Sequence, residues 1–396
     1  MTADVQPLDR DDRHDPHLAA AQALAPDLRA RADEIERGRR VPLDLVRAMA
    51  SAGMFRMCVP HALGGGEITP LAMMRVLETL GEADGSAGWC AMIGCTSGLL
   101  SGYLDPDAAA EIYGDPSGIA GGVYAPSGKA VPTSGGYRVS GRWPFASGVE
   151  HCTWLMGGSV ITENGAPRLL TSGAPDAPLM LFPARDVEII DTWNVSGLRG
   201  TGSHDIAVRD LFVPAAHAVS LVRDRPRAGG ALYVFPVFGL LAVGIAAVAL
   251  GIARRAITEL VEIAGGKRPT GSKRILAERA TAQVQVSEAE ALVRSGRAFL
   301  VEAVEAAWEA ASATGAIDLA TRAGVRLAAT NATLAAAQAV DRMYNAGGGT
   351  SVYATSPLQR CFRDVHVVTQ HLMVAPATYE LTGRLLFGLA TDAALL

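Results

Sequence analysis

The chain has 396 residues, more than the roughly 250 to 300 at which a single hydrophobic core usually stops growing, so we expect two or three packed domains. Hydrophobic residues make up 49% and charged residues 19%, a composition that excludes extended disorder. With 35 basic against 40 acidic residues the net charge is −5, so we expect neither nucleic acid nor a membrane surface as a partner.

The cysteines and histidines indicate neither a disulfide framework nor a metal site. The five cysteines form an odd set without a Cys-x-x-Cys pair, which is typical of a protein kept reduced in the cytoplasm. The first 17 residues are polar and charged and lack the apolar run of a signal peptide. The eight histidines do not stand at metal-ligand spacing from carboxylates, so no metal is predicted. We therefore expect a cytoplasmic location.

Three kinds of sequence pattern follow one another along the chain. The first quarter has apolar residues at intervals of three and four, with Pro42, Pro70 and Pro106 at first turns of helices. Near Ile119 short β-branched runs begin, separated by Gly, Pro and Ser, which predicts strands. From Ala231 onward, long runs of Ala, Leu and Val predict helices. The predicted α+β protein has an N-terminal α-helical domain (1–118), a central β domain (119–224) and a C-terminal helical bundle (225–396).

One segment is apolar enough to cross a bilayer. Gly229–Ala253 contains no charged residue and is long enough to span the hydrocarbon core. It also contains Pro236 and several glycines and continues into the amphipathic segment ARRAITELVEIA. A helix that is apolar on all sides lies either in lipid or in the core of a large protein, and we expect the second, a buried bundle helix.

Two glycine-containing segments of the β region can hold a ligand. Signatures of Rossmann enzymes, P-loop NTPases, α/β hydrolases and zinc proteases are absent. In GRWPFASGVEHCTW, the hydroxyl of Ser147 and nearby backbone amides can face a planar ligand, although an ordinary turn has the same composition. In WNVSGLRGTGSHD, three glycines permit close backbone approach, and Arg199, Thr201 and Ser203 can contact an anion or a carbonyl. A plain bulge and loop is an equal alternative there.

The third segment, SPLQRCFRDVHVVTQH, follows a triple-glycine loop in the predicted bundle. It carries Arg363 and Asp364, for which a structural ion pair is the alternative to a functional role. His366 and His371 are five residues apart, about 500° around a helix, so they point in different directions. At most one of the two histidines is therefore expected to be catalytic, and His366 is expected to be a satisfied surface histidine.

In this order and on regions of these lengths, the three segments resemble the acyl-CoA dehydrogenase fold. More narrowly, they are similar to the two-component (group D) flavin-dependent monooxygenases built on it, the relatives of hydroxyphenylacetate, secosteroid and dibenzothiophene monooxygenases. The resemblance covers about residues 18 to 390, and its most specific pieces are DTWNVSGLRGTGSHD, FASG and GGGTSVYATSPLQRCFRDVHVVTQH.

The catalytic base separates the two branches of this fold. The dehydrogenases carry a glutamate eight residues after the Asp of the Arg-Asp pair, whereas counting from Asp364 reaches Leu372. Their other location for it is early in the apolar bundle helix, yet no acidic residue stands between Asp224 and Glu259. His371 occupies the position of the monooxygenases' functional histidine. With an ordinary pKa of ~6.5 it can take a substrate proton and, once protonated, donate to a peroxide oxygen.

The resemblance also implies roles for the other segments. Ser147 is expected to bond the flavin near N(5) or the peroxide, with His371 as the second catalytic residue. Arg360 and Arg363, with the glycine loop, are expected to bind flavin phosphate across a subunit boundary, as in related tetramers. The remaining residues expected to bind flavin are Trp143 and Phe145 as walls of the isoalloxazine, then Arg199, Thr201, Gly202, Ser203, Gly348 and Gly349. The expected substrate pocket contains Trp89, Thr96 and Ser97.

The implied function is a monooxygenase that takes reduced FMN or FAD from a separate NAD(P)H-dependent reductase, because no nicotinamide motif is present, and forms a C4a-hydroperoxyflavin with O₂. The substrate is then a small organic molecule, aromatic or polyketide-like, and a homotetramer is implied. Several relatives carry a histidine in the helix where this chain has Cys95, Thr96 and Ser97, which leaves the oxidised atom open. The alternatives are an acyl-CoA dehydrogenase or oxidase with an unusual base, and a non-catalytic flavin- or lipid-binding bundle protein.

Overall fold

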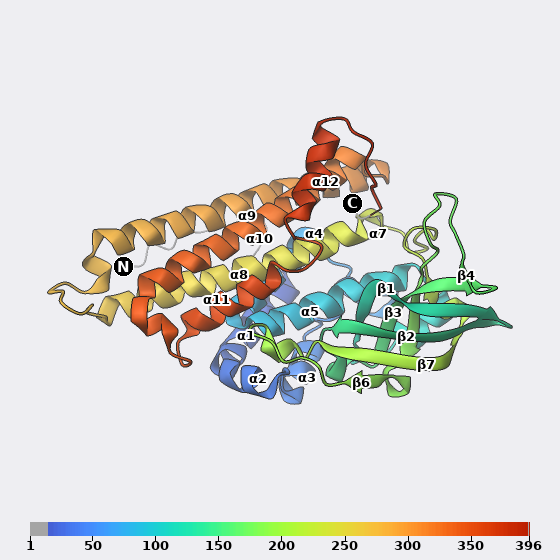
Figure 1. The fold of residues 1–396 in the computed structure, drawn as a ribbon, viewed down its shortest axis with the longest axis horizontal. Coiled ribbons are helices and arrows are strands. Elements are labelled where there is room, and N and C mark those ends of the chain that lie inside the picture. Colours follow the sequence, from blue (N-terminus) through green and yellow to red (C-terminus); the bar gives the residue numbers. More distant parts are fainter. Residues whose placement is uncertain (1–14, 395) are drawn as a thin grey trace.

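The computed structural model describes residues 15–394 and 396, so the first 14 residues of the predicted N-terminal domain lie outside it. Helices, then strands, then long helices follow one another as predicted (Figure 1). Prolines occupy the first turns of α1, α4 and α6, where a missing N–H costs nothing. The N-terminal helices are α1 (Pro16–Ala30), α2 (Ala32–Gly38), α3 (Leu43–Ser51), α4 (Pro70–Ala83), α5 (Gly85–Ser97) and α6 (Pro106–Tyr113).

The central region is one mostly antiparallel sheet in which β1 and β3 run parallel. Its strand order is β6-β7-β2-β1-β3-β5-β8, and β4 pairs with β3 beside that path. The sheet encloses its own core, in which the rings of Trp143 and Phe182 lie 5.9 Å apart. The strands are β1 (Ala120–Thr133), β2 (Gly136–Ala146), β3 (Trp154–Glu163), β4 (Ala166–Pro167), β5 (Leu179–Pro183), β6 (Glu188–Ile190), β7 (His204–Pro214) and β8 (Ala218–Val219).

The C-terminal helices form a bundle around α8, which is the apolar segment singled out in the sequence. Among the described residues α8 is the one helix long and apolar enough to cross a membrane, and 83% of its most apolar window is buried inside the protein. The expectation of a buried bundle helix is therefore confirmed. The helices are α7 (Ala231–Val234), α8 (Val237–Gly266), α9 (Ala280–Thr314), α10 (Leu319–Gly347), α11 (Pro357–Val368) and α12 (Ala377–Leu386).

Helix α5 joins the bundle to the sheet. Next to it, α4 and α8 cross so closely that a Cβ at Gly251 would lie 2.3 Å from the carbonyl oxygen of Glu78, so only glycine fits there. Helix α5 packs against α4 and α8 on one side, and against β1 and the short helix η6 (Arg199–Thr201) on the other. In Figure 1 it runs from beneath the bundle toward the strands. This junction is where the sequence motifs meet.

Candidate active site

Strand pairing brings the two serines of the β-region motifs together. Strands β2 and β7 are antiparallel, and Ala146 at the end of β2 is paired with His204 at the start of β7. The residues just beyond that pair, Ser147 and Ser203, therefore face one another, and their hydroxyl oxygens lie 2.7 Å apart. The backbone N–H of Gly148 donates to the carbonyl of Thr201 at 2.8 Å and fixes the two turns to each other.

A chain of hydrogen bonds runs through this pair from helix α5 into the loop 191–203 between β6 and β7, called here the glycine-containing loop. The indole Nε1–H of Trp89 donates to the Ser147 hydroxyl at 3.0 Å. The Ser203 hydroxyl lies 2.7 Å from the hydroxyl of Thr201, which donates to the carbonyl of Leu198 at 2.8 Å. The residues joined by these hydrogen bonds are almost completely buried, and Ser147 and Trp89 each keep 6% of their surface exposed.

His371 adjoins the same cluster through Trp89. It follows the C-terminus of α11, and its ring meets the Trp89 ring edge-on, with centroids 5.7 Å apart and planes at 63°. The backbone N–H of Met373 donates to its Nδ1 at 3.2 Å. The carbonyl of Met373 in turn accepts a hydrogen bond of 2.9 Å from the buried guanidinium of Arg326 on α10. The imidazole is thus held in a fixed orientation.

This environment makes His371 a neutral hydrogen-bond donor. Burial, with the nearby positive charge of Arg326, lowers the pKa of His371 to about 4. Because Nδ1 accepts a backbone hydrogen bond, the single proton of the neutral ring is on Nε2. The ordinary pKa expected for His371 is therefore corrected to a lowered one, and its catalytic role remains a prediction.

Two buried carboxyl groups beside α5 and α11 accept hydrogen bonds from backbone N–H groups. Asp364 on α11 accepts the backbone N–H of Leu198 at 2.6 Å, and Asp84 caps α5 by accepting the N–H of Ala87 at 2.9 Å. Burial raises the pKa of Asp364 to about 7 and that of Asp84 to about 6. Within the described residues, no carboxylate bonds to Trp89, Ser147 or His371.

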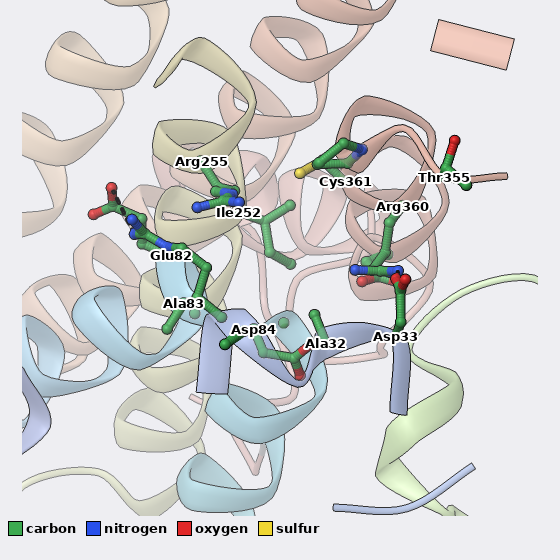
Figure 2. Close-up of a pocket in the computed structure, with 16 residues that line it drawn as sticks. Ala32, Asp33, Glu82, Ala83, Asp84, Ile252, Arg255, Thr355, Arg360 and Cys361 are labelled. Carbon is green, nitrogen blue, oxygen red and sulfur yellow. Dashed lines mark hydrogen bonds and ion pairs between the residues drawn. The ribbon is translucent and has the colours of Figure 1, made fainter. Parts of the chain in front are cut away.

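Asp84 and Asp364 line a polar cavity of about 230 Å³ between α1, α2, α4, α5, α8 and α11. Figure 2 shows Arg360 of α11 and Asp33 of α2, which both line this cavity, pointing toward each other. Arg360 pairs with Asp33 and, at 2.7 Å, with Glu36. Trp89, Ser147 and His371 are not among the residues that line this cavity, and ion pairs between α2 and α11 lie beside it.

The two arginines expected to bind phosphate are engaged within the chain. Arg363 pairs with Glu36 at 2.6 Å and donates to the carbonyl of Ser196 at 2.5 Å. Next to that contact, a Cβ at Gly197 would lie 2.2 Å from the carbonyl oxygen of Arg363. Arg360 and Arg363 therefore fasten α11 to α2, and Arg363 also fastens it to the glycine-containing loop, while their expected contact with flavin phosphate remains a prediction. The structural ion pair considered as an alternative for Arg363 is present, as an interhelical pair with Glu36.

The two aromatic residues expected to wall the flavin have opposite environments. Trp143 is 0% exposed inside the β domain, where its Nε1–H donates to the carbonyl of Gly158 at 2.7 Å, so it cannot touch a ligand. This corrects the prediction for Trp143. Phe145 is 67% exposed, its φ is +67°, and its ring lies 6.1 Å from that of Trp193. A large apolar ring held outward in a rare backbone conformation suits contact with a planar ligand.

The other predicted residues lie at different distances from the cluster. Arg199 has a buried Nε–H with no hydrogen-bond partner among residues 15–394. Gly202 has a φ of +51° and abuts the carbonyl of Arg39, so the turn itself requires glycine. Gly348 and Gly349 precede α11 whereas His371 follows it, so the 12-residue helix, ~18 Å long, separates them. One copy of the chain does not bring these two glycines to the site.

The predicted substrate residues on α5 are buried. Trp89 and Thr96 are seven residues apart, two helical turns, and so share a face. The Thr96 hydroxyl, however, donates to the carbonyl of Met92 in its own helix at 2.8 Å, and Ser97 is 1% exposed. Tyr124, whose hydroxyl interacts with Ser97, lines a smaller cavity of about 100 Å³ with apolar side chains from the β region and α8.

Sequence reasoning missed Arg326 and the role of Met373. The signal for Arg326 was present, because a lone arginine in the apolar stretch AGVRLAAT must find partners when its helix is buried. Its contact with the Met373 carbonyl joins positions 47 residues apart, which no local pattern reveals. The backbone of Met373 has no side-chain signal at all.

Comparison with known proteins identifies the family of the chain. Residues 14–107 match the family model "Acyl-CoA dehydrogenase, N-terminal domain", and residues 243–376 match "Acyl-CoA dehydrogenase, C-terminal domain". An indole-3-acetate monooxygenase of Pseudomonas putida is 36% identical over 364 residues, which cover 91% of this chain and 90% of that protein. The oxygenase subunit HsaA of a flavin-dependent monooxygenase of Mycobacterium tuberculosis is 30% identical, over 94% and 95% of the two chains.

Solved structures give the same result. The 3-HSA hydroxylase from Rhodococcus sp. RHA1 superposes with a TM-score of 0.88 at 28% identity, over 97% of this chain and all of that one. XiaF from Streptomyces, solved with FADH₂ and glycerol, has a TM-score of 0.85 at 28% identity, over 94% and 95% of the two chains. The chain therefore belongs to the flavin-dependent monooxygenases built on the acyl-CoA dehydrogenase fold.

Proposed function

We propose that this monooxygenase takes reduced FMN or FAD from a separate NAD(P)H-dependent reductase and oxygenates a small organic substrate beside His371. The observation that carries the proposal is a neutral imidazole next to Trp89 and Ser147, with no carboxylate bonded to the cluster in the described part of the chain. When bound, reduced flavin supplies the two electrons with which one atom of O₂ enters the substrate and the other leaves as water. HsaA is named as the oxygenase subunit of such a system.

The residues around Ser147 fit a flavin. Ser147 has a hydroxyl with remaining acceptor capacity and some exposed surface, and Phe145 offers an outward aromatic ring two residues away. The buried Nε–H of Arg199 lacks a partner among the described residues and suits a carbonyl or phosphate oxygen. These three residues would hold the isoalloxazine and its polar edge, and the burial of the cluster would keep water from the reacting oxygen.

His371 acts in this proposal as a donor from Nε2. The hydrogen bond from Met373 fixes the tautomer, and Arg326 disfavours a second proton on the ring. A neutral N–H that stays in place can stabilise negative charge developing on oxygen without a change of protonation. In this role His371 does not gain or lose a proton between pH 6 and 8, so the product yield is expected not to follow its titration.

We infer an aromatic or polyketide-like substrate. Relatives are named as a monooxygenase of indole-3-acetate and as a hydroxylase of resorcinol, both aromatic compounds. The smaller cavity is lined mainly by apolar side chains, and Tyr124 and Phe238 meet edge to face in it, 6.0 Å apart. Such a lining favours a ring-shaped apolar ligand with few polar groups.

We also propose a cytoplasmic homotetramer. Gly348 and Gly349 are exposed at the end of α10 far from His371, and Val352 and Tyr353 beside them are 69% and 70% exposed. A glycine loop flanked by exposed apolar residues suits contact with a second copy, where it can reach that copy's flavin phosphate. Sedimentation of the purified protein should give four times the chain mass, and a monomer at micromolar concentration would contradict this part.

The function is tested with His371 variants under single turnover with chemically reduced flavin, O₂ and indole-3-acetate or resorcinol as probe substrates. His371→Leu should lower product per flavin oxidised by about 10- to 100-fold and raise hydrogen peroxide correspondingly, because the N–H donor is lost. His371→Gln, which keeps an N–H, should recover part of the yield. His366→Gln is the control, since His366 is 41% exposed and pairs with Asp341.

The same experiment distinguishes donor from base. With a pKa of about 4, His371 stays neutral across pH 6 to 8, so wild-type product yield should be flat over that range. An inflection near pH 6.5 that disappears in His371→Gln would show acid–base cycling and refute the donor role. Unchanged yield in His371→Leu would remove the residue from the mechanism.

A further inference from the structure

The buried hydroxyl chain has a fixed direction. At one end the Trp89 indole N–H can only donate, and at the other the Leu198 carbonyl can only accept. Thr201 must use its single proton on Leu198, since two oxygens 2.8 Å apart would otherwise repel. The Ser203 proton must then bridge the 2.7 Å to Thr201. The Ser147 proton, in turn, must bridge the 2.7 Å to Ser203.

This direction determines what Ser147 presents to a ligand. Its only proton is directed at Ser203, and one of its two lone pairs accepts the Trp89 N–H. One lone pair remains. Ser147 is therefore an acceptor toward any group in front of it, although a serine hydroxyl taken alone can equally donate.

We propose that Thr201 is a positioning residue that, through Ser203, makes Ser147 an obligate acceptor and so gives the site a preference for the reduced flavin. The inference rests on the proposed function and on the expectation, implied by the family resemblance, that Ser147 faces flavin N(5). Reduced flavin carries an N–H at this atom and matches an acceptor. Oxidised flavin has only a lone pair there, which repels the lone pair of Ser147.

Binding oxidised flavin equally well would require Ser147 to turn its proton outward. One of the three links, Ser147–Ser203, Ser203–Thr201 or Thr201–Leu198, would then have two oxygens within 2.8 Å and no proton between them, inside a buried site. Losing a hydrogen bond between buried groups is costly, because no water replaces it. The hydrogen-bond chain therefore favours the binding of reduced flavin and the release of oxidised flavin after turnover.

Two substitutions change the direction of the hydrogen bonds between Ser147, Ser203 and Thr201 to different degrees. In Thr201→Val, Ser203 loses its acceptor and turns its proton to Ser147, which then accepts twice and is free to donate outward. In Ser203→Ala, the Ser147 proton is released while one lone pair also stays free, so Ser147 can act either way. Thr333→Val is the matched control, because Thr333 is fully buried and donates only within α10, to the carbonyl of Ala329 at 2.9 Å.

The experiment measures dissociation constants of oxidised and dithionite-reduced FMN and FAD, anaerobically, for the full chain and the three variants. The ratio of the oxidised to the reduced constant should be largest in wild type and Thr333→Val and about tenfold smaller in Thr201→Val, with Ser203→Ala between them. Dye equilibration should give a bound-flavin midpoint potential about 30 mV lower in Thr201→Val, the equivalent of tenfold for two electrons. A merely structural defect would weaken both redox states alike.

Three results overturn the inference. A wild-type ratio near one, or the same ratio in wild type and Thr201→Val, refutes it while leaving the monooxygenase function intact. If Thr201→Val does not fold, an unchanged ratio in Ser203→Ala has the same meaning. If the wild-type chain binds neither redox state of either flavin, the proposed function is itself refuted and this inference with it.

Discussion

Replacing Asp364 by asparagine should stabilise the protein at alkaline pH and leave it unchanged below about pH 4. Asp364 is 5% exposed, and burial raises the pKa of its carboxyl to about 7 from an ordinary 3.8. Because the folded pKa lies above the unfolded one, the stability contributed by this group is fully present below about pH 4 and is lost as the pH rises through 7. Asparagine stays neutral throughout and keeps an oxygen for the Leu198 N–H.

The magnitude follows from the raised pKa. Three pH units correspond to about 4 kcal/mol of unfolding free energy at pH 8, and we take about 2 kcal/mol as the lower bound because buried charges relax their surroundings. In a chain of this length each kcal/mol moves the melting temperature by roughly 1 to 2 °C. Asp84, whose pKa is raised to about 6, keeps a smaller pH dependence of the same sign in the variant.

Differential scanning calorimetry at pH 5 and pH 8, at one protein concentration, measures the effect. The melting temperature of Asp364→Asn minus that of wild type should be positive at both pH values, and about a third as large at pH 5 as at pH 8, because only the carboxyl of the unfolded chain is ionised at pH 5. Asp107→Asn, a substitution of an exposed carboxyl on α6, should show the same small difference at both pH values. If Asp364→Asn is less stable than wild type at pH 8, the carboxylate is ionised and stabilised by the arginines beside it, and the reasoning fails.

The contacts between α11, α2 and the glycine-containing loop give two further predictions. Gly197→Ala should lower the free energy of unfolding by about 3 kcal/mol in urea melts, because its Cβ would lie 2.2 Å from the Arg363 carbonyl oxygen. The control, Gly265→Ala, has open space around it and should be neutral or slightly stabilising. Equal effects of the two substitutions would contradict the close approach at Gly197. Glu36→Gln should cost about 2 kcal/mol at pH 7, since it weakens the pairs to Arg360 and Arg363. Because these pairs hold the pKa of Glu36 below its ordinary 4.5, the penalty should shrink as the pH falls below 4.5 and the carboxylate takes up a proton; a penalty independent of pH would contradict an ionic contribution.

The sequence predicted the order of the three regions because each has its own periodicity and punctuation. It also marked Ser147 and Ser203 as candidates, but not that they share a hydrogen bond, since this depends on the pairing of Ala146 with His204. Strand register between distant segments is set by tertiary packing rather than by local pattern. The motifs were therefore predictable, and their mutual geometry was not.

Trp143 shows why a neighbouring motif can mislead. It stands two residues before Phe145, yet it points into the β-domain core whereas Phe145 is exposed. Space for its indole is left by glycines on two neighbouring strands, since a Cβ at Gly128 or Gly157 would lie 2.2 or 2.4 Å from the ring. These partners come from β1 and β3, so the segment containing Trp143 carries no sign of them.

His371 was predictable as a position but not as a chemical state. Its pKa and tautomer depend on Arg326, 45 residues earlier, and on the backbone of Met373. The same holds for Arg360 and Arg363, whose acidic partners lie on α2 more than 300 residues away. Electrostatic states of this kind are properties of the folded environment.

One turn of α11 holds three successive residues of the glycine-containing loop, with Arg363 on the Ser196 carbonyl, Asp364 on the Leu198 N–H, and Gly197 pressed between them. The glycine-containing loop is thus attached to α11, the helix that leads to His371. A tilt of α11 would carry the histidine and the hydroxyl-bearing turn together and preserve their alignment. Substitutions that shift α11 can then change which substrates the enzyme accepts while the relative placement of His371 and the hydroxyl groups is kept.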